Sequence, residues 1–95
     1  MSWKQETESG LKQSVINYSR QYVNAPLSKG IYDDILTFAN SWIRGEIAKS
    51  KITGGECRQG DSQEIMKGNL SFSVELSKNE EKHKFEIMIK PGDFA

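Results

Sequence analysis

The segment Leu70-Ser-Phe-Ser-Val-Glu-Leu-Ser77 alternates apolar and polar side chains without interruption. A strand directs successive side chains to opposite faces of a sheet, so this period of two predicts a β-strand with one buried face. The polar residues 77–82 then reverse the chain, and residues 84–90 alternate again before Pro91 and Gly92 end the pattern. Together the two segments predict a β-hairpin with one apolar face that another element must cover.

A third and weaker strand is predicted just before this hairpin, at residues 52–58. Gly54 and Gly55 lie inside it, and glycine within a strand marks a bulge, a close backbone approach or a loop. Residues 59–62 have the composition of a turn. Three successive strands joined by short polar segments indicate an antiparallel meander.

Two amphipathic helices are predicted before the strands. In residues 3–24 the apolar positions recur at spacings of four, three and four, which places them on one face of a helix. These positions are Leu11, Val15, Tyr18 and Tyr22. Ser2 and Gln5 fit a capping box at the start of this helix. Gly10 weakens the helix, so residues 1–9 are expected to fray.

The second helix is predicted at residues 29–49, because Pro26 ends the first helix and Ser28 can cap the next one. Its apolar positions span about 180° of the helical wheel, against ~100° for a helix with one buried stripe. They are Ile31, Tyr32, Ile35, Leu36, Phe38, Ala39, Trp42, Ile43 and Ile47. We therefore expect the second helix to be covered from two directions.

These segments predict the α+β class, with two N-terminal amphipathic helices packed on one face of a three-stranded antiparallel β-meander, in the order ααβββ. A chain of 95 residues supports one hydrophobic core, and no repeat or linker divides it. The sequence therefore predicts a single small domain over residues 1–95, with residues 1–9 and 92–95 expected to fray.

The charge and cysteine content disfavour several classes of function. Thirteen Lys and Arg balance thirteen Asp and Glu, so no overall field attracts nucleic acid or anionic lipid. A single cysteine and a single histidine disfavour a disulfide framework and a structural zinc site. No apolar run approaches the ~20 residues that span a bilayer, and the N-terminus lacks the apolar core of a signal peptide. A cytoplasmic protein without a membrane partner is expected.

The residues that could carry chemistry lack partners at suitable spacing. His83 lies in a charged run at the hairpin and is expected to be solvated. Cys57 is flanked by Glu56 and Arg58, whose charges oppose one another, and is expected to be a passive thiol. The Gly54–Gly55 pair lacks the spacing of a phosphate-binding loop. The sequence thus predicts no catalytic residue, no metal site, no cofactor, no small-molecule ligand and no enzymatic activity.

Glu46 falls within the apolar arc of the second helix. A buried carboxylate without a partner is costly, and Glu46 lies in the last predicted turn. It is therefore expected to lie beyond the edge of the core. The alternative is a contact with a Lys or Arg of this chain or of a partner.

The function that remains is a small protein–protein interaction module, such as an adaptor, an inhibitor or a subunit, with a homodimer as its nearest form. Aromatic residues are frequent at binding hot spots, although each one here could equally belong to the core. The candidate interaction residues are Tyr18, Tyr22, Tyr32, Phe38, Trp42 and Glu46. The alternative is a nucleic-acid-binding accessory protein that uses a local basic patch formed by Lys49, Lys51, Arg58 and Lys67.

Overall fold

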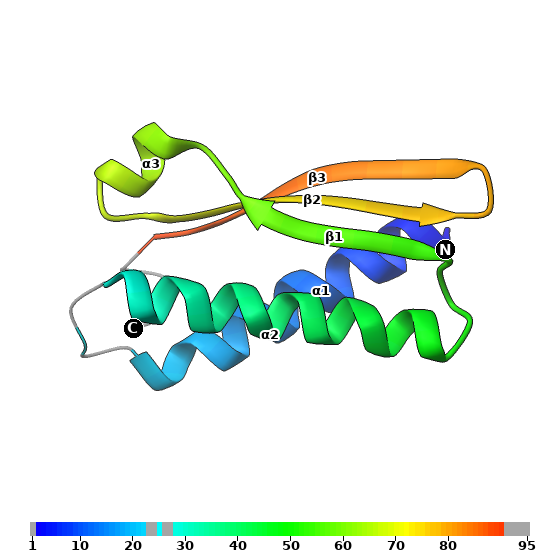
Figure 1. The fold of residues 1–95 in the computed structure, drawn as a ribbon, viewed down its shortest axis with the longest axis horizontal. Helices are drawn as coiled ribbons and strands as arrows, with labels where there is room; N and C mark the ends of the chain where they lie inside the picture. The colour runs from blue at the N-terminus through cyan, green and yellow to red at the C-terminus, as the bar shows by residue number, and fades with distance from the viewer. Residues whose placement is uncertain (1, 23–24, 26–27, 91–95) are drawn as a thin grey trace.

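The structure is a computed structural model in which residues 2–22, 25 and 28–90 are described. Two long helices precede an antiparallel three-stranded sheet, and Figure 1 shows the sheet and the helices as two layers. The elements in chain order are α1 (Trp3–Ser19), the 3-10 helix η1 (Arg20–Tyr22), α2 (Lys29–Ala48), β1 (Gly54–Gln59), α3 (Ser62–Met66), β2 (Leu70–Lys78) and β3 (Glu81–Ile89). The predicted α+β class and the antiparallel meander are confirmed.

The sheet has the order β1-β2-β3, with β2 in the centre. Gly54 pairs with Ser77 at one end of the β1–β2 ladder. Lys78 pairs with Glu81 beside the hairpin turn, so both strands extend further into segment 77–82 than the sequence predicted. Asn79 makes this tight turn possible because it adopts a φ of 58°, a conformation that Asn tolerates better than most residues.

α1 begins where the capping pattern predicts. The Ser2 hydroxyl accepts a hydrogen bond from the backbone N–H of Gln5 over 3.2 Å. The helix runs without interruption through Gly10, where a Cβ atom would lie 3.2 Å from Cζ2 of Trp42. Gly10 therefore allows α1 and α2 to approach closely. The predicted helix end at 23–24, the break at Pro26 and the predicted fraying at 92–95 lie outside the described residues.

α2 is the central helix of the domain. Ser28 caps it as predicted, accepting from the N–H of Ile31 over 3.2 Å. Its buried face of Ile35, Ala39 and Ile43 is at most 1% exposed. α2 contacts both β1 and α1, which accounts for its wide apolar arc.

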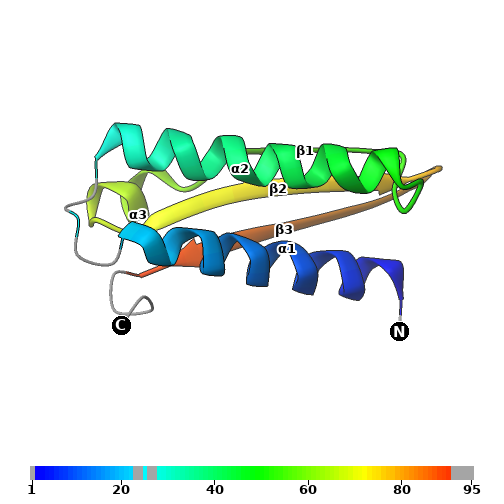
Figure 2. The ribbon, with the colours of Figure 1, turned by 90° about the horizontal axis from the view of Figure 1, so that it is seen from below.

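The predicted packing of two helices on the sheet is confirmed in part. Figure 2 shows α2 along β1 and α1 along β3, and the direct contacts follow the same division. The core between these elements is made of Leu11, Val15, Ile35, Ala39, Ile43, Ile52, Cys57, Leu70, Phe72, Val74, Leu76, Ile87 and Ile89. α1 thus meets the sheet at one edge strand rather than across its whole face.

The short helix α3 was not predicted from the sequence, which indicated only a turn at residues 59–62. Asp61 is its N-terminal cap and accepts from the N–H of Gln63 over 2.8 Å. The same residue types favour turns and helix caps, so composition alone did not separate the two. Before α3 the chain passes so close to β2 that a Cβ on Gly60 would lie 2.4 Å from Ser71 Oγ.

Candidate functional site

The two edges of the sheet differ in how their backbone groups are used. Gly60 N–H donates to the backbone oxygen of Ser71 over 3.0 Å, so the backbone groups of Ser71 point toward β1. In an antiparallel ladder, successive residues point their groups to alternate sides. Phe72 and Val74 lie one and three positions after Ser71, so their backbone groups point the other way and bond to β3. Along β3, residues whose backbone groups bond to β2 alternate with residues whose backbone groups point outward.

The outer edge of β3 is unpaired in the described part of the chain. The residues whose backbone N–H and C=O groups point outward in this register are Lys82, Lys84, Glu86 and Met88. Their side chains are all exposed, on the sheet face opposite the helices. Within residues 2–22, 25 and 28–90, no hydrogen bond reaches these four sets of backbone groups. An unpaired edge of this length is a template for a further strand.

The opposite edge, along β1, is occupied at its centre. The Asn40 side chain on α2 accepts from the N–H of Cys57 over 2.9 Å and donates to its backbone oxygen over 3.0 Å. One side-chain amide thus replaces a neighbouring strand at this position. Gly55 and Gln59 also face outward in this register and have no such contact among the described residues. β3, with four outward residues in succession, is therefore the longer uninterrupted edge.

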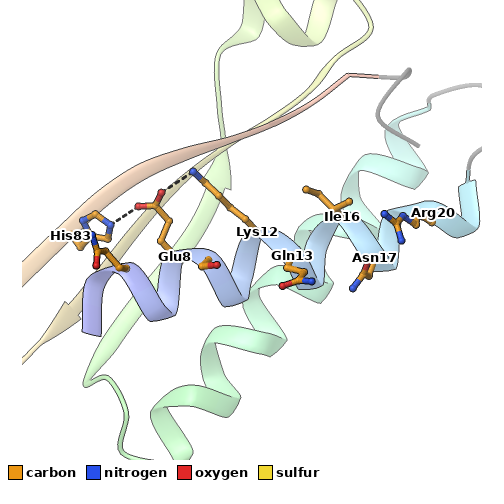
Figure 3. Close-up of a pocket in the computed structure, with 9 residues that line it drawn as sticks. Glu8, Lys12, Gln13, Ile16, Asn17, Arg20 and His83 are labelled. Carbon is orange, nitrogen blue, oxygen red and sulfur yellow. Dashed lines mark hydrogen bonds and ion pairs between the residues drawn. The ribbon is translucent and has the colours of Figure 1, made fainter. Parts of the chain in front are cut away.

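A groove of about 580 Å³ follows α1, with Glu8 and Lys12 on the side toward β3 and Gln13 and Asn17 on the side away from it (Figure 3). Its lining residues are polar except for Ile16, although their carbon atoms contribute much of the lining surface. The lining residues are Gln5, Glu8, Ser9, Lys12, Gln13, Ile16, Asn17, Arg20 and His83. His83 belongs to β3, Arg20 to η1 and the other lining residues to α1, so the groove joins the helix to β3.

Glu8 organises one end of this groove. Its Oε1 lies 2.6 Å from His83 Nε2, and its Oε2 lies 2.8 Å from Lys12 Nζ (Figure 3). The Lys12 hydrogen bond, aided by the one to His83, holds the pKa of the Glu8 carboxyl below its ordinary value, although burial opposes the shift. Lys12 also lies over the Phe85 ring, 5.6 Å from its centroid. The Glu8 carboxylate therefore connects α1 to β3.

His83 is not solvated as the sequence analysis expected. Its side chain is 23% exposed, and its ring contacts Trp3 edge-on at 6.5 Å and Phe85 at 5.2 Å. The signal was present in the sequence, because His83 is in phase with Phe85, Ile87 and Ile89 and so belongs to the helix-facing side of β3. The flanking charges obscured that alternation.

The arrangement offers ion pairing and hydrogen bonding along a groove and a strand edge. The contact between His83 and Glu8 joins β3 to α1. Among the described residues, no group of three or more His, Cys, Asp or Glu side chains could hold a metal ion.

Three of the candidate interaction residues meet between α1 and α2. Tyr18 and Tyr22 both donate their hydroxyls to Asp34 Oδ2, Tyr18 over 2.9 Å. Tyr18 also stacks on Phe38 with 4.1 Å between ring centroids. The bond to Asp34 raises the pKa of Tyr18 and raises that of Tyr22 to about 12, because ionisation would place two negative charges together. These residues join the two helices.

The other three candidates lie apart from that cluster. Tyr32 stacks on Phe72 and donates its hydroxyl to the backbone oxygen of Ser71 over 2.5 Å. Trp42 lies against Gly10 of α1. Glu46 is partly exposed and outside the core cluster, although its Oε2 is buried and has no hydrogen-bond partner among the described residues. The six candidates do not form one surface.

The alternative basic patch is divided by local ion pairs. Arg58 lies 3.0 Å from Glu56, and Lys67 lies 3.5 Å from Glu64. Half of the four cations named for nucleic-acid binding thus have a carboxylate neighbour of their own. The patch stays a prediction.

The sequence analysis did not identify Glu8, Lys12 or Asn40. Glu8 and Lys12 show the spacing of a helical ion pair, but nothing in that spacing reveals that the pair faces β3.

The described helices include none that is long and apolar enough to cross a lipid bilayer. The chain matches no family model, no curated protein and no solved structure.

Proposed function

We propose that the protein is a protein-interaction module that binds an extended segment of a partner chain by adding it as a fourth strand beside β3. The observation that carries this proposal is the difference between the two sheet edges. Asn40 occupies the edge of β1, whereas the outward backbone groups of β3 have no partner in the described chain. Strand addition uses such groups for affinity and side-chain pockets for specificity.

The groove supports the proposal through its length and position. The groove runs from Gln5 on α1 to Arg20 at the start of η1, which corresponds to about 22 Å of helix. An extended chain covers this length with about seven residues. Alternate side chains of an added strand would point toward the helices and enter the groove. In this proposal α1 and α2 both support one face of the sheet and leave the β3 edge accessible.

A single extended segment fits the edge better than a second copy of the domain. α1 lies along β3 in Figure 2, and Glu8 and Lys12 connect it to His83 and Phe85. A second copy paired through β3 would bring its own α1 into the same layer, where two helix axes need about 8–10 Å between them. Neighbouring strands are only about 4.8 Å apart, so the two helices would compete for space.

The aromatic candidates have a supporting role in this function. Tyr18, Tyr22 and Phe38 hold α1 against α2, and Trp42 packs against α1 at Gly10. These contacts fix the position of the groove beside β3. We retain a cytoplasmic location in the proposal because Cys57 is a buried free thiol that needs no oxidising compartment.

Proline substitution on β3 tests the proposal. Glu86→Pro removes an outward N–H without removing a bond to β2, and edge strands tolerate proline at such positions. Peptides of seven to nine residues selected from a displayed random library should bind the wild-type protein and Glu86→Ala, but not Glu86→Pro. Circular dichroism should show that all three proteins are folded.

Two outcomes would overturn the proposal. One is a library that yields no binder, or binders that recognise Glu86→Pro as well as the wild type. The other is a concentration-dependent dimer in sedimentation that Glu86→Pro abolishes, since the occupant of the edge would then be a second copy.

A further inference from the structure

We infer that the segment bound at β3 is acidic, with two carboxylate side chains two residues apart that face Lys82 and Lys84. This inference rests on the proposed strand addition and specifies the chemistry of the partner. The evidence for it is the distribution of charged side chains on β3 and in the groove beside it.

On the exposed face of β3, two lysines two positions apart share a single carboxylate. Lys82 Nζ lies 3.8 Å from Glu75 Oε1, and Lys84 Nζ lies 3.6 Å from Glu75 Oε2. The two lysine side chains are 68% and 75% exposed, and one carboxylate faces both of them. A partner strand could therefore supply a second carboxylate without displacing the first.

The groove, on the helix-facing side of β3, also carries a net positive charge. Lys12 and Arg20 contribute two positive charges and Glu8 one negative charge, which leaves a net charge of +1 before His83 is counted. Glu8 is already held between Lys12 and His83. An acidic segment is thus favoured on both sides of the added strand.

The acidic residues on β3 itself define where the carboxylates of the partner can lie. Glu81 pairs with Lys4 over 3.5 Å at the start of the strand. Glu86 follows Lys84 on the same exposed face, opposite Ser73 of β2. A carboxylate placed beside Glu86 would be repelled, since like charges directly across a sheet are destabilising. The favourable positions are therefore those beside Lys82 and Lys84.

The spacing of these two lysines matches the geometry of a strand. Residues two apart lie on the same face and are about 6.6–6.8 Å apart. A segment with an acidic residue at every second position would place both carboxylates beside the two ammonium groups. The side chain between them would point toward the groove near His83.

Two fluorescein-labelled peptides test the inference. The first is Val-Glu-Val-Glu-Val-Thr-Val-Thr-Val, and the second has lysine at both glutamate positions. Fluorescence anisotropy at low salt should show at least about tenfold tighter binding of the glutamate peptide. The difference should shrink as sodium chloride is added, because salt screens exposed charges.

Matched variants locate the effect. The double substitution Lys82→Ala with Lys84→Ala should lower the affinity for the glutamate peptide by about fivefold, as expected for the loss of two exposed cross-strand pairs. Arg44→Ala with Lys49→Ala removes the same charge from α2 and its C-terminal cap, and should leave the affinity unchanged because α2 lies along β1. Thermal unfolding followed by circular dichroism should confirm that both double variants are folded.

The possible failures can be told apart. Equal binding of the two peptides, with both lost in Glu86→Pro, would overturn the acidic chemistry while strand addition stands. Binding of the glutamate peptide that survives in Glu86→Pro would overturn strand addition itself. Absence of binding by the glutamate peptide would overturn the inference.

Discussion

The side-chain amide of Asn40 forms hydrogen bonds with both backbone groups of Cys57, over 2.9 and 3.0 Å. Cys57 lies at the middle of β1, and its backbone groups point to the outside of the sheet. Asn40 therefore acts as a one-residue substitute for a neighbouring strand and ties α2 to β1. Its Nδ2 also lies 3.2 Å from the backbone oxygen of Leu36. This contact interrupts the β1 edge at its centre, whereas no such contact interrupts β3 in the described part of the chain.

Asn40→Ala should lower the free energy of unfolding by about 1–3 kcal/mol, because it removes two hydrogen bonds and leaves buried backbone groups without partners. Urea denaturation followed by circular dichroism measures the change. Thr37→Ala, on the exposed face of the same helix, is the matched control and should change stability by less than about 0.5 kcal/mol. Equal stability of Asn40→Ala and wild type would contradict the role given to this amide.

The tyrosines that bind Asp34 should ionise at unusually high pH. Asp34 raises the pKa of Tyr22 to about 12 and also raises that of Tyr18. Spectrophotometric titration of the folded protein should show the Tyr22 transition near pH 12, and Asp34→Asn should move it toward 10. A transition that is unchanged in Asp34→Asn would show that Asp34 is not the cause.

The same pKa shift predicts how stability depends on pH. The folded state holds the Tyr22 proton more tightly than the unfolded state, in which the pKa is about 10. Its contribution is therefore fully present below pH 10 and is lost as the pH rises toward 12. Urea midpoints measured from pH 8 to 11 should fall less steeply in Tyr22→Phe than in the wild type.

Cys57 should be an unreactive thiol in the folded protein. Burial, with a smaller effect of the Glu56 charge, raises the pKa of the Cys57 thiol to about 12, and thiolate is the reactive form. At pH 8 a disulfide reagent should modify Cys57 at the rate of global unfolding, and 6 M urea should make the reaction fast. Rapid modification without denaturant would contradict the burial of this side chain.

Glu46→Met should raise the free energy of unfolding by about 1 kcal/mol. Glu46 Oε2 is buried without a hydrogen-bond partner among the described residues, and removing such a group relieves its desolvation cost. Glu46→Gln keeps a polar group at the same place, so its free energy of unfolding should rise by less. Loss of stability in Glu46→Met would indicate that this carboxylate has a stabilising contact.

The local pattern of the chain was sufficient for the elements themselves. The alternation at Leu70–Ser77 defined β2, and Ser2 and Ser28 marked the starts of the two long helices as observed. These features depend on side chains a few residues apart, whose spacing is visible in the sequence. The helix at Ser62–Met66 was missed because Asp61 suits a turn and a helix cap equally well.

The candidate site could not be derived in the same way. Glu8 and His83 are separated by 75 positions, and Asn40 and Cys57 by 17, so no local period relates them. The sequence alone determined the two long helices, the hairpin strands and their apolar faces, because those properties follow from the backbone period. Only the tertiary structure decided that Asn40 closes one sheet edge and that α1 lies beside the other, because these relationships arise when distant segments pack.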